Sequence, residues 1–380
     1  MKILVVTARY TVTGVPLAQA RFAAALAEAG HAVDYMVGLR ATGRPMPVIP
    51  GVRSIELNSP KTRNMAAALW RYLRRERPDV VFAAEDHLTC VVLAAAVACR
   101  SRARISGSSR VPPFDTYSDK VASKRWLLKQ AMRALAWRAD ALTCVSQDMV
   151  AQYQAMLPGM GHQCVYNIID KAASLDRMAE PLDDPWFADG LPPPIVAAGS
   201  LAPYKGFADL IHAMALLQAR APQARLVILG EGPLRAELEA LVARLGLTDR
   251  VRLPGRVANP LRYFSRARVF ALSSHFEGMP NVLVEAMMCG CTPVAADCPT
   301  GPRELLQDGR FGYLVRKADP AHLADGLCAA LARPVAPELL EEAIAPFAQD
   351  RVIARHFALL GLADAAIQSS SRQASITESE

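Results

Sequence analysis

Two glutamates eight residues apart, Glu277 and Glu285, span the expected start of a helix. Pro280 suits the first helical position, because its fixed φ matches the helix and its missing N–H would have no partner there. The helix is therefore predicted to begin near Asn281, with Glu285 about one turn inside it and Glu277 on the preceding loop. Free amides and the positive end of the helix dipole lie between the carboxylates and attract phosphate. A nucleotide-sugar, in which a diphosphate joins a nucleoside to a sugar, fits this pattern.

Several short motifs surround this glutamate pair. Upstream the chain reads Gly199-Ser200-Leu201, Lys205-Gly206 and Gly230-Glu231-Gly232-Pro233-Leu234, and downstream it reads Thr300-Gly301-Pro302-Arg303. Together these motifs resemble those of the retaining GT-B glycosyltransferases of family 4, also called group 1. The resemblance is dense from about residue 195 to residue 330 and looser before it.

The resemblance implies an α/β protein of the GT-B fold, with two Rossmann-like doubly wound domains facing a central cleft. The apolar pattern agrees, because short buried strands alternate with helices in both halves of the chain. Strands are predicted at 2–6, 32–37, 79–84, 103–106, 141–145, 164–167, 195–198, 226–229, 251–253, 269–272 and 292–295. A polar, proline-broken stretch from 171 to 194 reads as a linker.

Four segments follow from this organisation. The first is an N-terminal acceptor-binding domain at 1–173, and the second is a C-terminal nucleotide-sugar-binding domain at 190–345. A helix at 346–367 is expected to return to the first domain, as the last helix does in GT-B proteins. The serine-rich segment 368–380 is predicted to be disordered.

The resemblance also implies a role for each matching residue of the donor site. Lys205 would balance the charge of the departing diphosphate, and Glu277 would contact the sugar near the reacting carbon. Glu285 would bind the ribose hydroxyls. The remaining donor contacts would come from Gly230, Gly278, Met279, Pro280, Asn281 and Val282.

One residue of the family pattern is missing from the donor site. Where the family has an arginine shortly before the lysine, this chain has Ser200, which can donate a hydrogen bond but carries no charge. Losing one preorganised donor weakens transition-state stabilisation by on the order of a few kcal/mol. Arg9 and Arg303 are the cations expected to compensate.

The first domain offers fewer matching residues. Gly14 precedes a predicted helix and matches the glycine of the family's first loop, which follows the strand that ends near Arg9. Many family members contact the donor sugar with a histidine after the fourth strand, but this chain has only serines, a glycine and an arginine there. His87 is therefore the candidate for this contact, and Glu85 and Asp86 are candidates for binding acceptor hydroxyls.

Positive charge is concentrated in the first domain. Residues 1–175 contain 23 Lys and Arg against 12 Asp and Glu, although the whole chain has a net charge of only +7. The segment 118–139 is predicted to be a helix that mixes basic residues with Trp and Leu, and such a helix can lie on an anionic membrane surface. A solvated helix face is the alternative. The expected membrane contacts are Lys124, Arg125, Trp126 and Lys129.

Other partners and cofactors are not expected. A nucleic-acid surface would bring stacking aromatic residues or a recognisable module, and neither is evident. No Asp-x-Asp motif is present, and Cys289 and Cys291 lack further ligands at a suitable spacing, so no metal is predicted.

The expected location follows from three features of the sequence. The apolar stretch at 88–99 is too short to span a membrane, and the N-terminus runs directly into a predicted strand. The cysteines are scattered through apolar segments, which suits a reducing compartment. A cytoplasmic protein, peripheral on the inner membrane face, is expected.

The predicted function is retaining, metal-independent glycosyl transfer. The donor is expected to be a UDP-linked hexose or N-acetylhexosamine, and the acceptor a lipid-linked sugar or glycan in surface polysaccharide or glycoconjugate synthesis. Ser200 and the missing histidine keep open a catalytically weak sugar-nucleotide or glycan-binding partner of an assembly complex. A GT-B sugar-nucleotide epimerase is a third possibility.

Overall fold

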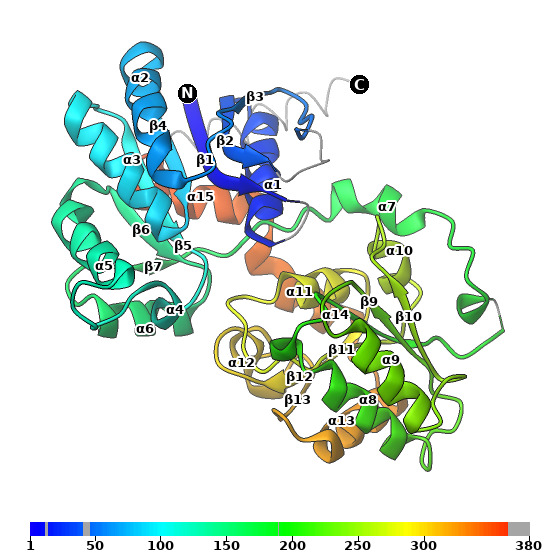
Figure 1. The fold of residues 1–380 in the computed structure, drawn as a ribbon. Coiled ribbons are helices and arrows are strands. Elements are labelled where there is room, and N and C mark those ends of the chain that lie inside the picture. Colours follow the sequence, from blue (N-terminus) through cyan, green and yellow to red (C-terminus); the bar gives the residue numbers. More distant parts are fainter. Residues whose placement is uncertain (12–13, 41–45, 189, 364–380) are drawn as a thin grey trace, which may run out of the picture. The chain divides into compact units, whose positions relative to one another are not determined.

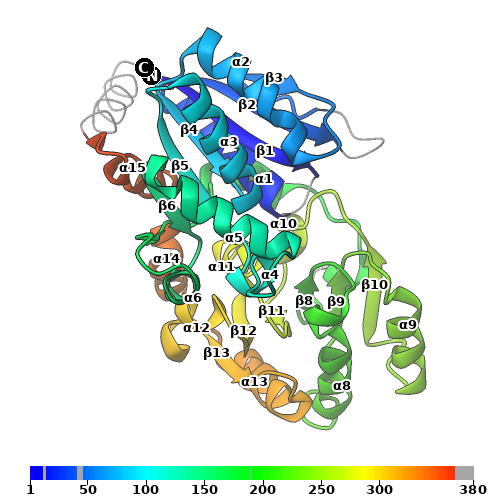
Figure 2. The same ribbon diagram turned by 60° about the vertical axis from the view of Figure 1, so that its left-hand side comes forward.

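The structure is a computed structural model that describes residues 1–11, 14–40, 46–188 and 190–363. The chain divides into two compact units. The first unit comprises Met1–Ile168 together with the segment that begins at Gln349, and the second comprises Ile169–Ala348. Each unit has its own parallel sheet covered by helices (Figure 1; Figure 2).

The sheet of the first unit has the strand order β3-β2-β1-β4-β5-β6-β7. Its strands are β1 (Lys2–Tyr10), β2 (Ala32–Arg40), β3 (Val52–Glu56), β4 (Val80–Ala84), β5 (Arg104–Ser109), β6 (Ala141–Cys144) and β7 (Gln163–Cys164). The helices are α1 (Gly14–Glu28), α2 (Ala66–Glu76), α3 (Asp86–Cys99), α4 (Pro113–Thr116), α5 (Lys124–Leu135), α6 (Gln147–Met156) and α15 (Gln349–Leu359). The order changes direction between β1 and β4, and such a switch point is where doubly wound sheets bind ligands.

Helix α15 follows the second unit in sequence but belongs to the core of the first. Its Val352, Ile353 and Phe357 side chains are buried in the same cluster as Phe22 and Phe82. Burial of these side chains removes apolar surface from water, which stabilises the first unit and holds α15 on it.

The sheet of the second unit has the strand order β10-β9-β8-β11-β12-β13, with a switch point between β8 and β11. Its strands are β8 (Ile195–Ala198), β9 (Leu226–Leu229), β10 (Val251–Gly255), β11 (Val269–Leu272), β12 (Thr292–Asp297) and β13 (Tyr313–Arg316). The helices are α7 (Leu175–Ala179), α8 (Phe207–Leu217), α9 (Arg235–Arg244), α10 (Leu261–Phe264), α11 (Asn281–Met288), α12 (Pro302–Leu305), α13 (Pro320–Ala332) and α14 (Pro337–Ile344).

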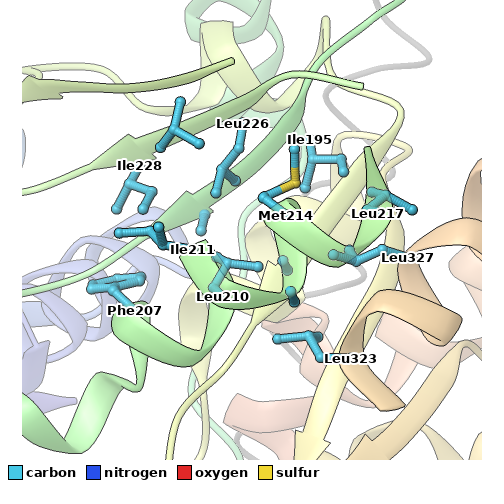
Figure 3. Packing of buried hydrophobic residues seen from close by; sticks show 14 of the residues in the cluster. Ile195, Phe207, Leu210, Ile211, Met214, Leu217, Leu226, Ile228, Leu323 and Leu327 are labelled. Carbon is cyan, nitrogen blue, oxygen red and sulfur yellow. The ribbon is translucent and has the colours of Figure 1, made fainter. Parts of the chain in front are cut away.

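The core of the second unit shows why its strands read as continuous apolar runs. Strands β8 and β9 are almost fully buried, as parallel strands covered on both faces must be. Figure 3 shows Leu210, Ile211 and Met214 of α8 packing toward Ile195 and Leu226 of these strands. A close-packed contact of this kind fixes the position of α8, and therefore of the loop that precedes it.

Two edge strands and one helix differ from the prediction. The sequence did not indicate β3 and β13, because both are partly exposed, β3 mixes polar and apolar residues, and the apolar run of β13 is shorter than those of β8 and β11. The basic helix predicted at 118–139 is shorter, since α5 spans only Lys124–Leu135. It begins where the Ser123 hydroxyl accepts a hydrogen bond from the Trp126 amide, a helix N-cap that the predicted start missed.

The segment predicted to be a linker, 171–194, packs against the second unit. Met178, in α7, and the neighbouring Arg177 offer carbonyls to Ser265 and Asn259 of the second unit. Trp186 is buried between the guanidinium groups of Arg225 and Arg252. The final helix was predicted to reach residue 367, whereas α15 ends at Leu359, and residues 364–380, including the predicted disordered tail, lie outside the described residues.

Candidate active site

Lys205 and Glu277 meet at the switch point of the second sheet. Lys205 ends the loop after β8, and Glu277 lies in the loop after β11, so the two neighbouring strands bring them together. The Lys205 Nζ to Glu277 Oε1 distance is 2.6 Å, and the two side chains are only 13% and 11% exposed. A shielded pair of opposite charges at this point can receive a ligand that carries both anionic and hydroxyl groups.

A serine fixes the carboxylate of the pair. The Ser274 hydroxyl donates to Oε1 of Glu277 at 2.6 Å, so this one oxygen accepts from both the lysine and the serine. The Glu277 amide donates to the carbonyl of Pro299 at 3.3 Å, and the Thr300 hydroxyl donates to the Glu277 carbonyl. The side chain and backbone of Glu277 are therefore both held before any ligand binds.

The lysine and glutamate loops are bonded directly to each other. The Ser273 hydroxyl donates to the Lys205 carbonyl at 2.9 Å, and the His275 amide donates to the Tyr204 carbonyl at 2.7 Å. The His275 ring lies 2.7 Å from a carboxylate oxygen of Asp209, in the first turn of α8. Sequence reasoning missed Ser274, His275 and Asp209, because only the fold makes these two loops neighbours.

Two glycines permit this close approach of loops. Gly206 has a φ of +62°, and a Cβ there would lie 2.1 Å from the Ser273 carbonyl oxygen. Gly230 has a φ of +152°, and a Cβ there would lie 1.8 Å from the Gly199 carbonyl oxygen. Any larger residue at either position would push the loops apart. Gly230, predicted to contact the donor, thus also has a packing role.

Helix α11 begins at Asn281, as the position of Pro280 predicted, with Pro280 itself just before the first turn. Met279 and Pro280 are buried, whereas Gly278, Val282 and Glu285 are partly exposed. The Asn281 amide donates to the Met279 carbonyl, and Pro280 has no N–H. Of the five predicted donor-loop residues, Gly278, Met279 and Val282 therefore remain as the candidate amide donors to a phosphate.

Two other predicted donor residues, Ser200 and Arg303, are exposed. Ser200 is exposed on the loop that leads to Lys205. Arg303 bonds to the carboxylates of Asp297 and Asp308, at 2.7 Å for the latter. This exposed guanidinium already pairs with two carboxylates and would have to exchange them for a diphosphate, so its compensating role stays a prediction.

In the first unit, the candidate residues gather at the switch point between β1 and β4. Arg9 is exposed near the end of β1, Gly14 begins α1 with a φ of +63°, and His87 lies in the first turn of α3. The His87 Nε2 atom is 3.4 Å from a carboxylate oxygen of Glu85. Asp86, in contrast, points into the interior and is only 5% exposed, so it cannot contact an acceptor as predicted.

The predicted membrane contacts need one correction. Lys124 and Arg125 are exposed and Trp126 is partly exposed, but Lys129 is buried. Its Nζ atom lies 2.6 Å from Asp119 and 3.3 Å from the Met156 sulfur, because this face of α5 packs on the unit. The exposed basic and large apolar residues of this region are instead Phe114, Lys120, Val121, Lys124, Arg125, Leu127, Arg133 and Trp137, with the exposed carboxylates of Asp115 and Asp119 among them.

Neither a metal cluster nor a membrane span is found in the part of the chain that the structure describes. Across residues 1–11, 14–40, 46–188 and 190–363, no three His, Cys, Asp or Glu side chains converge as metal ligands would. In the same ranges, every helix is too short or too polar to cross a bilayer.

The two doubly wound parallel sheets define the GT-B class of fold, and solved structures share it. The Anabaena protein HepE in complex with UDP aligns with a TM-score of 0.73 and 22% identity over 94% of this chain and 100% of that one. The lipopolysaccharide outer core galactosyltransferase WaaB aligns with a TM-score of 0.70 and 17% identity over 97% and 100%.

Two family models match successive parts of the sequence. The model "Glycosyl transferase 4-like domain" matches residues 13–166, and the model "Glycosyl transferases group 1" matches residues 192–333. The chain belongs to the group 1 glycosyltransferase family, which is family 4.

Curated relatives support the same assignment over shorter stretches. A Campylobacter jejuni N-acetylgalactosaminyltransferase, whose named acceptor is a diphospho-undecaprenol-linked disaccharide, is 41% identical over 35% of this chain and 36% of its own. The alpha-D-kanosaminyltransferase of Streptomyces kanamyceticus is 29% identical over 61% of this chain and 60% of its own. The chain thus matches less than two thirds of the length of these relatives.

Proposed function

We propose that this protein is a retaining glycosyltransferase that moves a hexose or N-acetylhexosamine from a UDP-sugar to a lipid-linked or glycan acceptor, without a metal ion. The observation that carries the proposal is the lysine–glutamate pair at the switch point of the second sheet. The family supplies the reaction type and the retaining stereochemistry. The UDP bound by HepE supports a uridine donor.

The chemistry of the proposed site follows from its charges. As the bond to the sugar breaks, negative charge grows on the departing diphosphate, and the Lys205 ammonium would stabilise this charge. The amide groups and dipole at the start of α11 add positive potential where a metal ion would otherwise be needed. Glu277, held by Ser274, would accept hydrogen bonds from the sugar hydroxyls, and Glu285 from the ribose.

A lysine variant tests the assignment of the donor site. Lys205→Ala should lower UDP affinity at least tenfold and reduce transfer by about 10²–10³-fold, as loss of a preorganised charge does. Calorimetric titration with UDP and mass spectrometry of the products measure both quantities. Lys317→Ala, an exposed lysine of the same unit, is the matched control and should behave like the wild type.

Three further readouts separate the proposal from its alternatives. NMR of the product gives the anomeric configuration, and inversion would contradict retention. Activity abolished by EDTA and restored by Mg²⁺ or Mn²⁺ would contradict a metal-free reaction. A new sugar-nucleotide formed without an acceptor would identify an epimerase, and UDP binding without turnover would identify a binding partner.

The proposed place of action is an anionic membrane surface, since the Campylobacter relative is named for a polyprenol-linked substrate. The contact would be the basic–apolar surface, defined by Phe114, Lys120, Val121, Lys124, Arg125, Leu127, Arg133 and Trp137. Exposed apolar side chains can enter the interface, and each basic residue adds about 1 kcal/mol near anionic lipid before salt screening.

Vesicle co-sedimentation tests this contact. Changing Lys124, Arg125 and Arg133 to Glu should abolish binding to anionic vesicles. The matched control makes the same charge change at Arg71, Arg74 and Arg75, exposed arginines of α2 in the same unit. An equal loss in both triple variants would mean that net charge, not this surface, attracts the protein, and equal binding to neutral vesicles would contradict the electrostatic contribution.

A further inference from the structure

Glu85 has a backbone conformation that residues with a side chain rarely adopt. It follows β4 directly, beside the switch point of the first sheet, with φ 74° and ψ 134°. Its helix ends at Arg100 with φ 52° and ψ 42°, the milder left-handed conformation common at helix ends. Strain such as that at Glu85 persists only where the surroundings enforce it, and it clusters at ligand sites.

The neighbours of Glu85 enforce this conformation. Its amide donates to the Ser108 carbonyl at 2.8 Å. The next residue, Asp86, is buried and accepts hydrogen bonds of 2.6 Å from the hydroxyls of Ser109 and Tyr153. Because Asp86 is fixed in the interior on one side and the strand end is fixed on the other, the Glu85 backbone cannot relax.

The enforced conformation leaves the Glu85 carboxylate at the surface of a polar cluster. Its side chain is 33% exposed, and that of His87, at 3.4 Å, is 45% exposed. Burial raises the pKa of the Glu85 carboxyl, whereas the charges of His87, Arg110 and Arg9 oppose the rise. Among the residues that the structure describes, the buried Arg110 Nε and Ser108 hydroxyl have no hydrogen-bond partner. Arg110 is close enough to lower the pKa of the Glu85 carboxyl, and a held carboxylate near an incompletely paired guanidinium is a candidate ligand site.

We propose that Glu85 and His87 bind a hydroxyl group of the acceptor sugar. The proposal rests on the proposed transferase function and assigns the acceptor contact to a residue that no family motif marks. A carboxylate accepts the O–H hydrogen bond, and the imidazole 3.4 Å away can donate to the same oxygen. A hydroxyl fits better than an anion, because the Glu85 carboxylate would repel a second negative charge.

A glycine substitution at Glu85 distinguishes acceptor binding from a structural role, because it should raise stability and weaken acceptor binding at the same time. Glu85→Gly removes the side chain from a conformation that glycine adopts freely, so the melting temperature of the first unit should rise by about 2 °C or more. The acceptor KM of this variant should be at least tenfold higher than that of the wild type, measured with a synthetic N-acetylhexosamine linked to polyprenyl diphosphate. UDP affinity should not change, because the proposed contacts to the diphosphate and the ribose, Lys205 and Glu285, lie in the second unit.

Two more variants complete the test. Glu85→Gln keeps the shape and the strain, so it should raise the acceptor KM without raising the melting temperature. Arg100→Gly, at the other end of the same helix and also at positive φ, is the control that should gain stability and keep normal transfer. A lower melting temperature for Glu85→Gly, or an unchanged acceptor KM in both Glu85 variants, overturns the proposal. A wild type that binds no UDP contradicts the proposed function instead, and the melting temperatures still show whether Glu85 is strained.

Discussion

The two sheets of this molecule have the same doubly wound design, but their switch points are built differently. In the second unit, an ion pair of 2.6 Å is largely buried, and two loops are bonded to each other around it. In the first unit, the buried carboxylate of Asp86 has only a structural role, and the strained Glu85 next to it is partly exposed among cations. A shielded ion pair suits a diphosphate that is common to all donors, whereas a more exposed carboxylate and imidazole suit the hydroxyl groups of an acceptor.

The largest effect that tests this contrast is expected at Glu277. Glu277→Gln should reduce transfer by about 10²–10³-fold, because the amide cannot replace a carboxylate that binds the sugar in the transition state. UDP affinity should not fall, since Lys205 loses its carboxylate partner and becomes available to phosphate. Single-turnover kinetics and calorimetric titration measure the two quantities.

The control for this variant is Glu237→Gln, at an exposed glutamate of α9 in the same unit. This variant should leave both the rate of transfer and the UDP affinity unchanged. If Glu277→Gln weakens UDP binding as much as Lys205→Ala does, then Glu277 contributes to the nucleotide site, and the division between sugar and diphosphate contacts is wrong.

The two units should also respond differently to acid. Burial lowers the pKa of His162 to about 4 and that of His356 to about 3, and both lie in the first unit. In the unfolded chain these histidines titrate near 6.5. As pH falls below about 6.5, these histidines take up a proton in the unfolded chain but stay neutral in the folded one. By pH 4.5, each histidine therefore lowers the free energy of unfolding by roughly 2–3 kcal/mol. The histidines of the second unit, His212, His275 and His322, are not buried.

Scanning calorimetry at pH 7 and pH 4.5 tests this difference. The raised pKa values of Glu85 and Asp86 in the same unit act in the opposite direction, because protonation of these carboxyls favours the fold. His356→Leu isolates the histidine contribution, and its first-unit transition should fall less on acidification than that of the wild type. Limited proteolysis identifies which unit opens. Equal shifts of both transitions would mean that carboxylates spread over the whole chain, rather than two buried histidines, set the acid response.

The sequence predicted the two sheets and marked Lys205 and Glu277 as candidate site residues, because both strands and motifs are local signals. Apolar runs mark strands such as β8 and β11, which are buried on both faces, whereas the apolar run of the partly exposed edge strand β13 is shorter. The motifs marked Lys205 and Glu277 without showing that they touch.

The rest of the site depends on contacts between distant segments. His275 and Asp209 are 66 positions apart and meet only because β8 and β11 are neighbours. The burial of Lys129 could not be predicted from its helix, because it depends on contacts with Asp119 and Met156 from other segments. The positive φ of Glu85 could not be predicted, because a glutamate in the sequence gives no sign of a strained backbone.

The smallest expected effect concerns the missing arginine. Ser200 is exposed on the loop before Lys205, so Ser200→Arg adds a guanidinium there without disturbing the core. One added charge-assisted contact should increase UDP affinity or turnover by up to about tenfold, and the gain should shrink as salt rises. Ser200→Gln, which adds length without charge, is the control. No gain with arginine would mean that another cation already serves the diphosphate, whereas turnover that only this variant shows would favour a weak binding partner over an enzyme.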